Sequence, residues 1–212
     1  MDILQEISEN LQKGKNIEVA NLVKSALSSG INPKKILDEG MIAGMNIIGI
    51  RFKNNEIYIP EVLIAARAMY AGLDILRPLL SQTNAKPVGR VIIGTVKGDI
   101  HDIGKNIVKM MMEGAGFEVI DLGNNVSEDK FVEAVNLHSP DIVAMSAMLS
   151  TTMTQMKSIM IALKNAGIRE KIMVMIGGAP ITKRYAEEIG ADGYGRDATE
   201  AVEVAKNLLN HH

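Results

Sequence analysis

Cysteine is absent from this chain of 212 residues, and the formal net charge is only −2. Without cysteine, disulfides, zinc clusters, iron–sulfur centres and thiol catalysis are excluded. Without an excess of one charge, bulk electrostatic binding to nucleic acid or to an anionic membrane is not expected. Any chemistry of this protein therefore has to come from other side chains.

Long apolar runs are missing as well. No window approaches the roughly 18 uninterrupted apolar residues of a membrane-spanning helix. The start of the chain, Met1 to Glu6, lacks the basic and apolar regions of a signal peptide. We therefore expect a soluble, cytoplasmic protein with no membrane partner. His211 and His212, native or left from a tag, carry no part of this interpretation.

The first part of the chain, up to about Gln82, has apolar residues at three- and four-residue spacing and no strand-like alternation. This spacing predicts helices. Asn32 followed by Pro33 suits the start of one helix, and Pro60 suits the first position of another. Four helices with short links favour a small four-helix bundle. The expected helices are Asp2 to Lys13, Ile17 to Ser28, Pro33 to Ile50 and Pro60 to Leu80.

From Gly89 the pattern changes to short β-branched runs that alternate with helical patterns. Five such units in series predict an α/β domain of flavodoxin-like or Rossmann type, with a five-stranded parallel sheet covered by helices on both faces. Thr83 to Pro87 is the expected linker and offers a hinge, so the predicted domains are 1–84 and 88–212. The expected strands are Arg90 to Thr95, Glu118 to Asp121, Asp141 to Met145, Ile172 to Ile176 and Gly193 to Gly195. The expected helices are Ile103 to Glu113, Glu128 to Leu137, Met153 to Asn165, Lys183 to Ile189 and Thr199 to Leu209.

Parallel sheets bind their ligands at the carboxyl ends of the strands, near the point where the strand order reverses. The residues that follow each strand are therefore candidate contacts. No Gly-x-Gly-x-x-Gly follows any strand, which counts against a dinucleotide cofactor. The candidates are His101 and Gly104 after the first strand, Gly123 to Asn125 after the second, Ser146 to Thr152 after the third, Gly177 and Gly178 after the fourth, and Gly195 to Asp197 after the fifth.

The segment from Asp99 to Gly104 is the most informative of these, because it places one histidine beside carboxylates. Imidazole is a common metal ligand, and a carboxylate on its second nitrogen fixes the tautomer. His138 precedes the third strand and so belongs to the opposite edge of the sheet. Zinc and non-haem iron normally take at least three protein ligands. Asp99 and Asp102 beside His101 would give only a weak, strained set.

A macrocycle resolves this shortage, because it supplies four equatorial nitrogens and asks the protein for one axial ligand. Only three Phe and four Tyr occur in the chain, so a haem pocket is disfavoured and a corrin is the better interpretation. The motif Asp99-x-His101-x-x-Gly104 resembles that of cobalamin-binding domains in which a histidine replaces dimethylbenzimidazole beneath cobalt.

Further motifs extend the resemblance over nearly the whole chain. Ser146-Ala147-Met148 and Ile176 to Pro180 resemble the Ser-x-Leu and Gly-Gly motifs that line the channel for the nucleotide tail, with Met148 in place of the usual leucine. The first part of the chain is similar to the helical cap of methionine synthase and of corrinoid proteins in anaerobic methyltransferase systems. That similarity is carried by Gly44 to Gly49, Phe52 and Tyr58 to Glu61.

The resemblance implies a role for each matched residue. His101 would be the lower axial ligand of cobalt, and Asp99 would accept a hydrogen bond from its second ring nitrogen. Thr152, or Ser150 in its place, would complete this relay, and these groups would take part in the chemistry. Ser146 would hydrogen-bond the displaced base. The implied cofactor contacts are Asp99, His101, Asp102, Ile103, Gly104, Ser146, Met148, Leu149, Ser150, Thr152, Gly177, Gly178, and, from the cap over the upper face, Phe52 and Ile59. Asn125 stands where relatives often show aspartate and receives no role.

The function implied by the resemblance is that of a methyl carrier. The chain would take a methyl group from a substrate-specific methyltransferase and pass it to a second methyltransferase, whose acceptor is tetrahydrofolate or a thiol. It would also need a reductive activase, and alone it would be half an enzyme. The donor stays open among methanol, a methylamine, glycine betaine and a methoxylated aromatic.

Two other classes share the histidine motif. A cobalamin-dependent mutase subunit would not need the helical cap. A corrinoid sensor usually adds a DNA-binding domain, and no basic recognition helix is seen, although a sensor or storage protein stays open.

Each motif also has a purely structural interpretation. Gly177-Gly178 alone is typical of a strand-to-helix turn. Ser150 to Thr152 can cap the helix that starts near Met153. Phe52 and Ile59 can belong to the core of the bundle.

Overall fold

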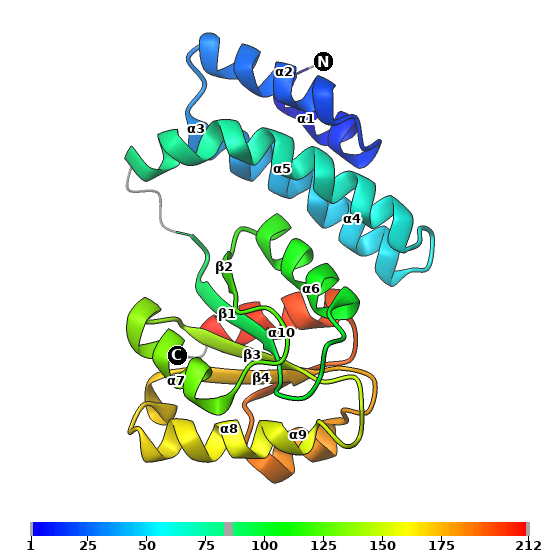
Figure 1. Cartoon of the computed structure of the whole chain (residues 1–212). Helices are drawn as coiled ribbons and strands as arrows, with labels where there is room; N and C mark the ends of the chain where they lie inside the picture. The colour runs from blue at the N-terminus through cyan, green and yellow to red at the C-terminus, as the bar shows by residue number, and fades with distance from the viewer. Residues whose placement is uncertain (1, 83–86, 211–212) are drawn as a thin grey trace. The chain divides into compact units, whose positions relative to one another are not determined.

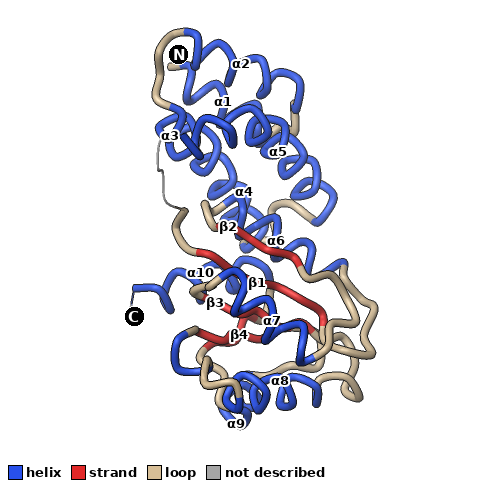
Figure 2. The backbone as a smooth tube through the Cα atoms, turned by 60° about the vertical axis from the view of Figure 1, so that its left-hand side comes forward, coloured by secondary structure: helices blue, strands red, loops and turns tan. Residues whose placement is uncertain are grey.

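The computed structural model describes residues 2–82 and 87–210, and these fall into two compact units. The first unit comprises the residues up to Pro87 together with Gly114–Gly116, and the second comprises Val88–Glu113 and the residues from Phe117 onward. The first is built from helices, and the second contains the strands (Figure 2). Residues 83–86, on which most of the predicted linker falls, and the terminal histidines lie outside the described residues. The predicted domain boundaries therefore stay a prediction.

The helical unit contains the four predicted helical segments. Asp2 and Asn32 cap two of them, accepting hydrogen bonds from the amides of Leu4 and Lys34. The last helix begins one residue earlier than expected, with Pro60 in its second position, and the Glu61 carboxylate accepts a hydrogen bond from the Tyr58 amide just before it. The elements are α1 (Ile3–Gln12), α2 (Asn16–Ser28), α3 (Pro33–Lys35), η1 (Ile36–Ile42), α4 (Ala43–Lys53) and α5 (Ile59–Gln82).

The third predicted segment is not uniformly α-helical, because its middle part, η1, is a π-helix. Glycines on this segment allow α1 to approach closely. A Cβ on Gly40 would lie 3.2 Å from Ile7 Cγ2, and one on Gly44 would lie 3.1 Å from the Ser8 carbonyl oxygen. The core of the unit is apolar and includes Ile7, Leu11, Val19, Val23, Ile36, Met41, Ile48, Met69 and Leu76.

The second unit alternates strands and helices as predicted, with most boundaries within one residue of the expected ones. The strands are β1 (Arg90–Thr95), β2 (Glu118–Asp121), β3 (Ile142–Ser146), β4 (Met173–Gly177) and β5 (Gly193–Gly195). The helices are α6 (Ile103–Gly114), α7 (Glu128–His138), α8 (Thr154–Asn165), η2 (Arg169–Lys171), α9 (Lys183–Ile189) and α10 (Ala198–Asn210). The sheet is parallel throughout, with the strand order β2-β1-β3-β4-β5. The predicted fold class is confirmed.

The helices form a layer on each face of this sheet: α6 and α10 cover one face, and α7, α8 and α9 cover the other (Figure 1). Successive side chains of each strand point to opposite faces of the sheet, so the strands contribute apolar residues to the core on each face. Ile92, Val143 and Val174 belong to the cluster under α7, α8 and α9. The order reverses between β1 and β3, so the loops after these strands meet at the switch point, where doubly wound sheets bind ligands.

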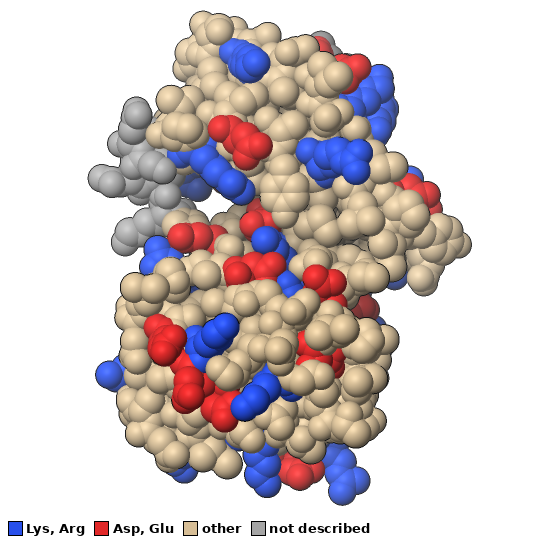
Figure 3. Space-filling model, viewed as in Figure 1, with Lys and Arg blue, Asp and Glu red and all other residues tan. Residues whose placement is uncertain are grey.

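The surface agrees with the small net charge of the sequence. Figure 3 shows acidic and basic side chains interspersed on the face in view. Within residues 2–82 and 87–210, no helix has the length and apolar character that crossing a membrane requires.

Candidate functional site

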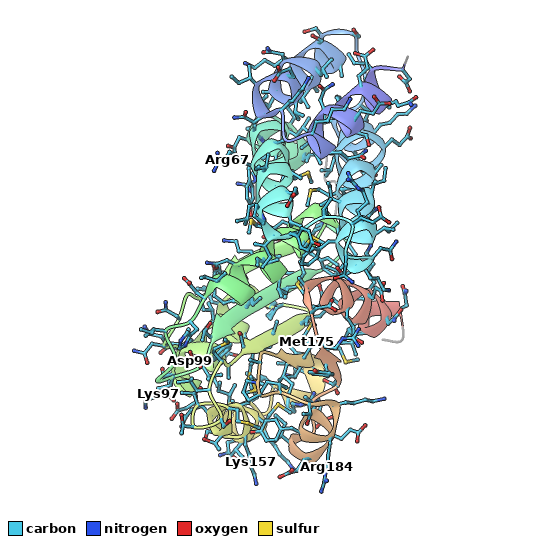
Figure 4. The ribbon with its side chains drawn as sticks, turned by 90° about the vertical axis from the view of Figure 1, so that its right-hand side faces the viewer. Arg67, Lys97, Asp99, Lys157, Met175 and Arg184 are labelled. Atoms are coloured by element: carbon cyan, nitrogen blue, oxygen red, sulfur yellow. The ribbon has the colours of Figure 1, made fainter. Side chains whose placement is uncertain are left out.

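Asp99 lies in the loop between β1 and α6 (Figure 4), and His101 follows in the same loop. The loop after β3 reaches the same edge of the sheet, because the Met148 amide donates to Asp99. Asp99 is fully buried, whereas the His101 side chain is 52% exposed. His101 Nδ1 lies 2.7 Å from Asp99 Oδ1. The loop therefore fixes one ring nitrogen of the histidine to a buried acid.

The Asp99 carboxylate accepts four hydrogen bonds. Oδ1 accepts from the His101 ring at 2.7 Å and from the His101 backbone amide at 3.1 Å. Oδ2 accepts from the Thr152 hydroxyl at 2.6 Å and from the Met148 amide at 2.8 Å. Ser150, the alternative to Thr152 in the sequence interpretation, is exposed, and Thr152 is buried. The structure thus brings Thr152, Asp99 and His101 into one hydrogen-bonded chain.

These contacts set the charge of the acid. Burial alone would raise the pKa of Asp99, but the hydrogen bonds from Thr152, Met148 and His101 outweigh it and hold this pKa well below its ordinary value. The carboxylate is therefore ionised and acts as an acceptor, so His101 Nδ1 carries the proton. In the neutral imidazole with this tautomer, the other ring nitrogen, Nε2, has the free lone pair that a metal ligand needs.

Two residues without a role in the sequence interpretation hold the backbone of this loop. Thr95 Oγ1 donates to the His101 carbonyl oxygen at 3.0 Å. Asn125 Oδ1 accepts from the Gly98 amide at 2.8 Å, and the Asn125 amide donates to the Asp99 carbonyl oxygen at 2.9 Å. Asn125 has φ +52°, in the left-handed region that asparagine tolerates. In the sequence, the tolerance of asparagine for left-handed backbone was the feature that could have indicated a structural role for Asn125.

Apolar side chains are exposed next to His101 in the chain and in the loop after β3. Ile100 and Ile103 are 72% and 74% exposed, and Met148 and Leu149, in the loop after β3, are 50% and 43% exposed. Grouped apolar exposure of this kind marks a surface that receives a ligand or partner. Sequence reasoning named Ile103, Met148 and Leu149 but missed Ile100, although it lies inside the motif.

The three predicted glycines differ in whether neighbouring atoms leave room for a side chain. A Cβ on Gly104 would meet nothing within 4 Å, so the chain itself gives no packing reason for this glycine. Gly177 is constrained, because its Cβ would lie 2.9 Å from the Gly195 carbonyl oxygen. Gly178 has φ +127°, and its Cβ would collide with the Ala147 carbonyl oxygen. The open space at Gly104 is what a bound group beside His101 would use.

Three other residues were predicted to contact the cofactor, and the structure says less about their relation to His101. Asp102 is partly buried, and its carbonyl oxygen accepts from the Asn106 amide in the first turn of α6. Phe52 is partly buried and Ile59 is 42% exposed, both in the helical unit. Their expected place over the upper face of the cofactor stays a prediction, because the two units are described separately.

A buried ion pair holds the start of α6 to the end of β2. Lys105 is only 3% exposed, and its Nζ lies 2.6 Å from Asp121 Oδ1, which also accepts from the Gly123 amide at 2.9 Å. Burial would raise the pKa of Asp121, but the hydrogen bonds and the charges of Lys105 and Lys109 lower it overall. This pair fixes the helix that begins two residues after His101.

The donor set around His101 fits a metal that arrives in a macrocycle. In the part of the chain that the structure describes, no three His, Asp or Glu side chains are grouped so as to hold a metal ion. His138 lies at the far edge, where its carbonyl oxygen accepts from Arg90 at the start of β1. A single imidazole with a free nitrogen, flanked by exposed apolar side chains and by the open space at Gly104, suits one axial bond beneath a flat ring.

Comparison with known proteins agrees with this reading of the site. Residues 89–203 match the B12 binding domain family, and residues 3–77 match a second family that is also described as a B12 binding domain. The dimethylamine corrinoid protein of Methanosarcina barkeri is 41% identical over 209 residues, covering 98% of each chain. Trimethylamine corrinoid protein 2 of Methanosarcina acetivorans is 44% identical over 210 residues, covering 98% of this chain and 94% of the relative.

Solved structures show the same two-part architecture. The methanol:cobalamin methyltransferase complex MtaBC of Methanosarcina barkeri contains a chain that matches with a TM-score of 0.89 at 27% identity, covering 99% of this chain and 80% of that one. A cobalamin-binding protein of Desulfitobacterium hafniense matches with a TM-score of 0.78 at 28% identity, covering 98% of each chain. Cobalamin, the cofactor expected from the sequence, is thereby confirmed. The chain belongs to the B12-binding corrinoid proteins of methyltransferase systems.

Proposed function

We propose that this protein is a methyl carrier that binds cobalamin with His101 Nε2 as the lower axial ligand. It receives a methyl group from a substrate-specific methyltransferase and presents it to a second methyltransferase. The bound corrinoid supplies the cobalt centre that accepts and gives up the methyl group, and the protein supplies ligand, orientation and access.

The observation that carries this proposal is the chain from Thr152 through Asp99 to His101. A buried, ionised Asp99 with four hydrogen-bond donors cannot turn away from His101 without losing several of them. The imidazole is therefore held by Nδ1 while its exposed part faces outward. A carboxylate behind a ligating histidine also raises the basicity of the ligand. Asp99 and Thr152 thus position the ligand without touching the metal.

The surroundings of His101 supply the rest of a corrinoid site. Ile100, Ile103, Met148 and Leu149 offer apolar contact to a flat ring, and Gly104 offers space beside it. Ser146, Gly177 and Gly178 stand at the ends of β3 and β4, where we place the nucleotide tail. Phe52 and Ile59 of the helical unit would shield the upper face.

We further propose that the methyl donor is a methylamine, activated by a dedicated partner enzyme. The support is the similarity over nearly the whole chain to dimethylamine and trimethylamine corrinoid proteins, at 41% and 44% identity. The MtaBC match, from a methanol system, has lower identity at 27%. The second methyltransferase, with a thiol or tetrahydrofolate acceptor, and a reductive activase complete the set of partners, and the proposed location is the cytoplasm.

The test loads the apoprotein with hydroxocobalamin, removes the excess, and records the visible spectrum of the wild type, His101→Ala and His138→Ala. We expect stoichiometric binding, an altered spectrum for His101→Ala only, and an unchanged one for His138→Ala. The reduced holoprotein is then mixed with dimethylamine-, trimethylamine- or methanol-specific methyltransferase and the matching donor. Methylation with an amine-specific partner supports the proposal. Failure with all three partners contradicts the carrier role, and methylation with the methanol partner alone contradicts the choice of donor.

A further inference from the structure

Met148 is an exposed methionine in a chain whose other described methionines are at least partly buried. The sequence contains 14 methionines. Among those within residues 2–82 and 87–210, Met148 alone is exposed, at 50%. Met110, Met153 and Met173 are partly buried, and the rest are buried. An oxidant in solution therefore reaches the thioether of Met148 before those of the other described methionines.

The backbone around this side chain is fixed by hydrogen bonds. The Met148 amide donates to Asp99 Oδ2 at 2.8 Å. The carbonyl oxygen of the next residue, Leu149, accepts from the amides of Thr152 at 3.1 Å and Met153 at 3.0 Å. The side chain of Met148 is thus presented on a rigid loop. A chemical change of that side chain alters the surface at this place, because the loop is held where it is.

Met148 and His101 are attached to the same carboxylate. The Met148 amide binds Oδ2 of Asp99, and His101 Nδ1 lies 2.7 Å from Oδ1. Met148 therefore lies beside the proposed cobalt ligand, among exposed apolar side chains that offer contact to a flat ring. Of these side chains it is the one with a sulfur atom, which hydrogen peroxide oxidises. The set comprises Ile100, Ile103, Met148 and Leu149.

We infer that Met148 is an oxidation site, at which hydrogen peroxide converts the thioether to a sulfoxide and thereby weakens binding of the corrinoid. The effect on binding rests on the proposed function, because it requires the corrinoid to lie against His101. In the oxidation, a sulfur lone pair attacks one peroxide oxygen, the oxygen–oxygen bond breaks, and a sulfur–oxygen bond forms. Sulfur loses two electrons, and the second peroxide oxygen leaves as water with both protons.

The sulfoxide changes the surface and leaves the fold intact. A polar oxygen replaces part of an apolar contact, and a ring that covers it has to strip it of water. The hydrogen bond from Met148 to Asp99 comes from the backbone amide, so it is retained in the oxidised chain. Affinity for the corrinoid should therefore fall while the stability of the apoprotein stays the same. Methionine sulfoxide reductases should restore the affinity.

The first experiment locates the oxidation. The apoprotein is treated with hydrogen peroxide until about one oxygen atom per chain is added, and peptide mass spectrometry identifies the modified methionine. We expect Met148 to be oxidised before Met110, Met153 and Met173. The protein loaded with hydroxocobalamin is treated in parallel. There Met148 should be oxidised more slowly than in the apoprotein, because the bound ring covers it.

The second experiment measures affinity by titration with hydroxocobalamin before and after oxidation, once the peroxide has been removed. The wild type should bind about tenfold more weakly after oxidation and recover on treatment with methionine sulfoxide reductases. Met148→Leu has no sulfur at this position, so its affinity after peroxide should equal its own starting value. Met173→Leu is the matched control: Met173 begins β4, at the opposite end of the sheet, and this variant should lose affinity as the wild type does.

The melting temperature of the apoprotein separates a local effect from general damage, and it should be the same before and after oxidation of Met148. Preferential oxidation of another methionine would overturn the inference. So would an unchanged affinity of the oxidised wild type, or an equal loss of affinity in Met148→Leu. If the unoxidised wild type does not bind hydroxocobalamin, the proposed function itself fails, whereas the other contrary results leave that function intact.

Discussion

Asp99 Oδ1 and His101 Nδ1 are 2.7 Å apart, with the acid wholly buried and the imidazole half exposed. The Asp99 carboxylate is held rigidly inside the protein, whereas the His101 imidazole is accessible from outside. Rigidity comes from the Thr152 hydroxyl and the Met148 amide on the second carboxylate oxygen. Access comes from the position of His101 in the loop just before α6.

Asp99→Asn tests the buried carboxylate. The amide keeps the volume but replaces an acceptor oxygen by a donor, which then faces donors in a buried place. We expect the free energy of unfolding of the apoprotein to fall by about 2–3 kcal/mol, as measured by urea denaturation. The holoprotein should lose histidine ligation in part, seen as a mixed visible spectrum. A variant as stable as the wild type would contradict the reading of this network.

Thr152→Val tests the hydroxyl at the far end of the chain of hydrogen bonds. Removing the 2.6 Å bond to Asp99 should cost about 1–2 kcal/mol of apoprotein stability, and Thr152→Ser should recover most of it. Ser150→Ala is the matched control, because Ser150 is exposed. We expect no measurable change for that control. Equal effects of Thr152→Val and Ser150→Ala would show that Thr152 has no special role.

Gly104→Ala and Gly178→Ala should have opposite effects on the apoprotein. Gly104 has room for a Cβ and lies in a helix, so alanine there should leave stability unchanged or raise it by up to about 1 kcal/mol. If the cofactor uses that room, hydroxocobalamin should bind about tenfold more weakly. Unchanged affinity would show that the space is not part of the site.

Gly178→Ala should unfold the apoprotein more easily even without cofactor. Its φ of +127° and the collision with the Ala147 carbonyl oxygen predict a loss of more than about 2 kcal/mol in urea denaturation. A stable Gly178→Ala variant would contradict the constraint that the structure assigns to this turn.

Asp121→Asn tests the buried pair with Lys105. At pH 7 the variant leaves the buried ammonium without its counter-ion and should lose about 3 kcal/mol of stability. The pKa of Asp121 is lowered in the folded state, so its contribution is fully present above the unfolded value of about 4 and is lost as the pH falls through the lower folded value. The deficit of the variant should therefore shrink below pH 4.

The measurement is urea denaturation of the wild type and Asp121→Asn at pH 7, 4 and 3. Asp38→Asn provides the control, because Asp38 forms an exposed pair with Lys34 at 3.0 Å and should contribute less than about 0.5 kcal/mol. A deficit of constant size across these pH values would contradict the assigned shift.

The sequence carried most of the fold, because its periodicities are strong. Strands such as Arg90–Thr95 and helices such as Lys183–Ile189 have the predicted limits. The π-helical stretch Ile36–Ile42 was not predicted, since its residues have ordinary helical spacing and its geometry depends on how the helices of this unit pack.

The site was predictable only where a motif is local. Asp99 and His101 are two residues apart, so their contact follows from the loop itself. Thr152 is 53 residues away from Asp99, and nothing local distinguishes it from Ser150; burial in the folded chain does. Thr95 was missed for the same reason, because a threonine in a strand gives no sign of where its hydroxyl will point.

The most direct test of the account is electron paramagnetic resonance of the cob(II)alamin-loaded protein, prepared with and without nitrogen-15-labelled histidine. The nuclear spin of an axial nitrogen splits the cobalt lines, into three with ordinary nitrogen and into two with the heavy isotope. We predict that labelling histidine converts triplets to doublets, and that His101→Ala abolishes this conversion while His138→Ala preserves it. Triplets that persist in the labelled wild type would show that the cofactor's own base occupies the axial position and would contradict ligation by His101.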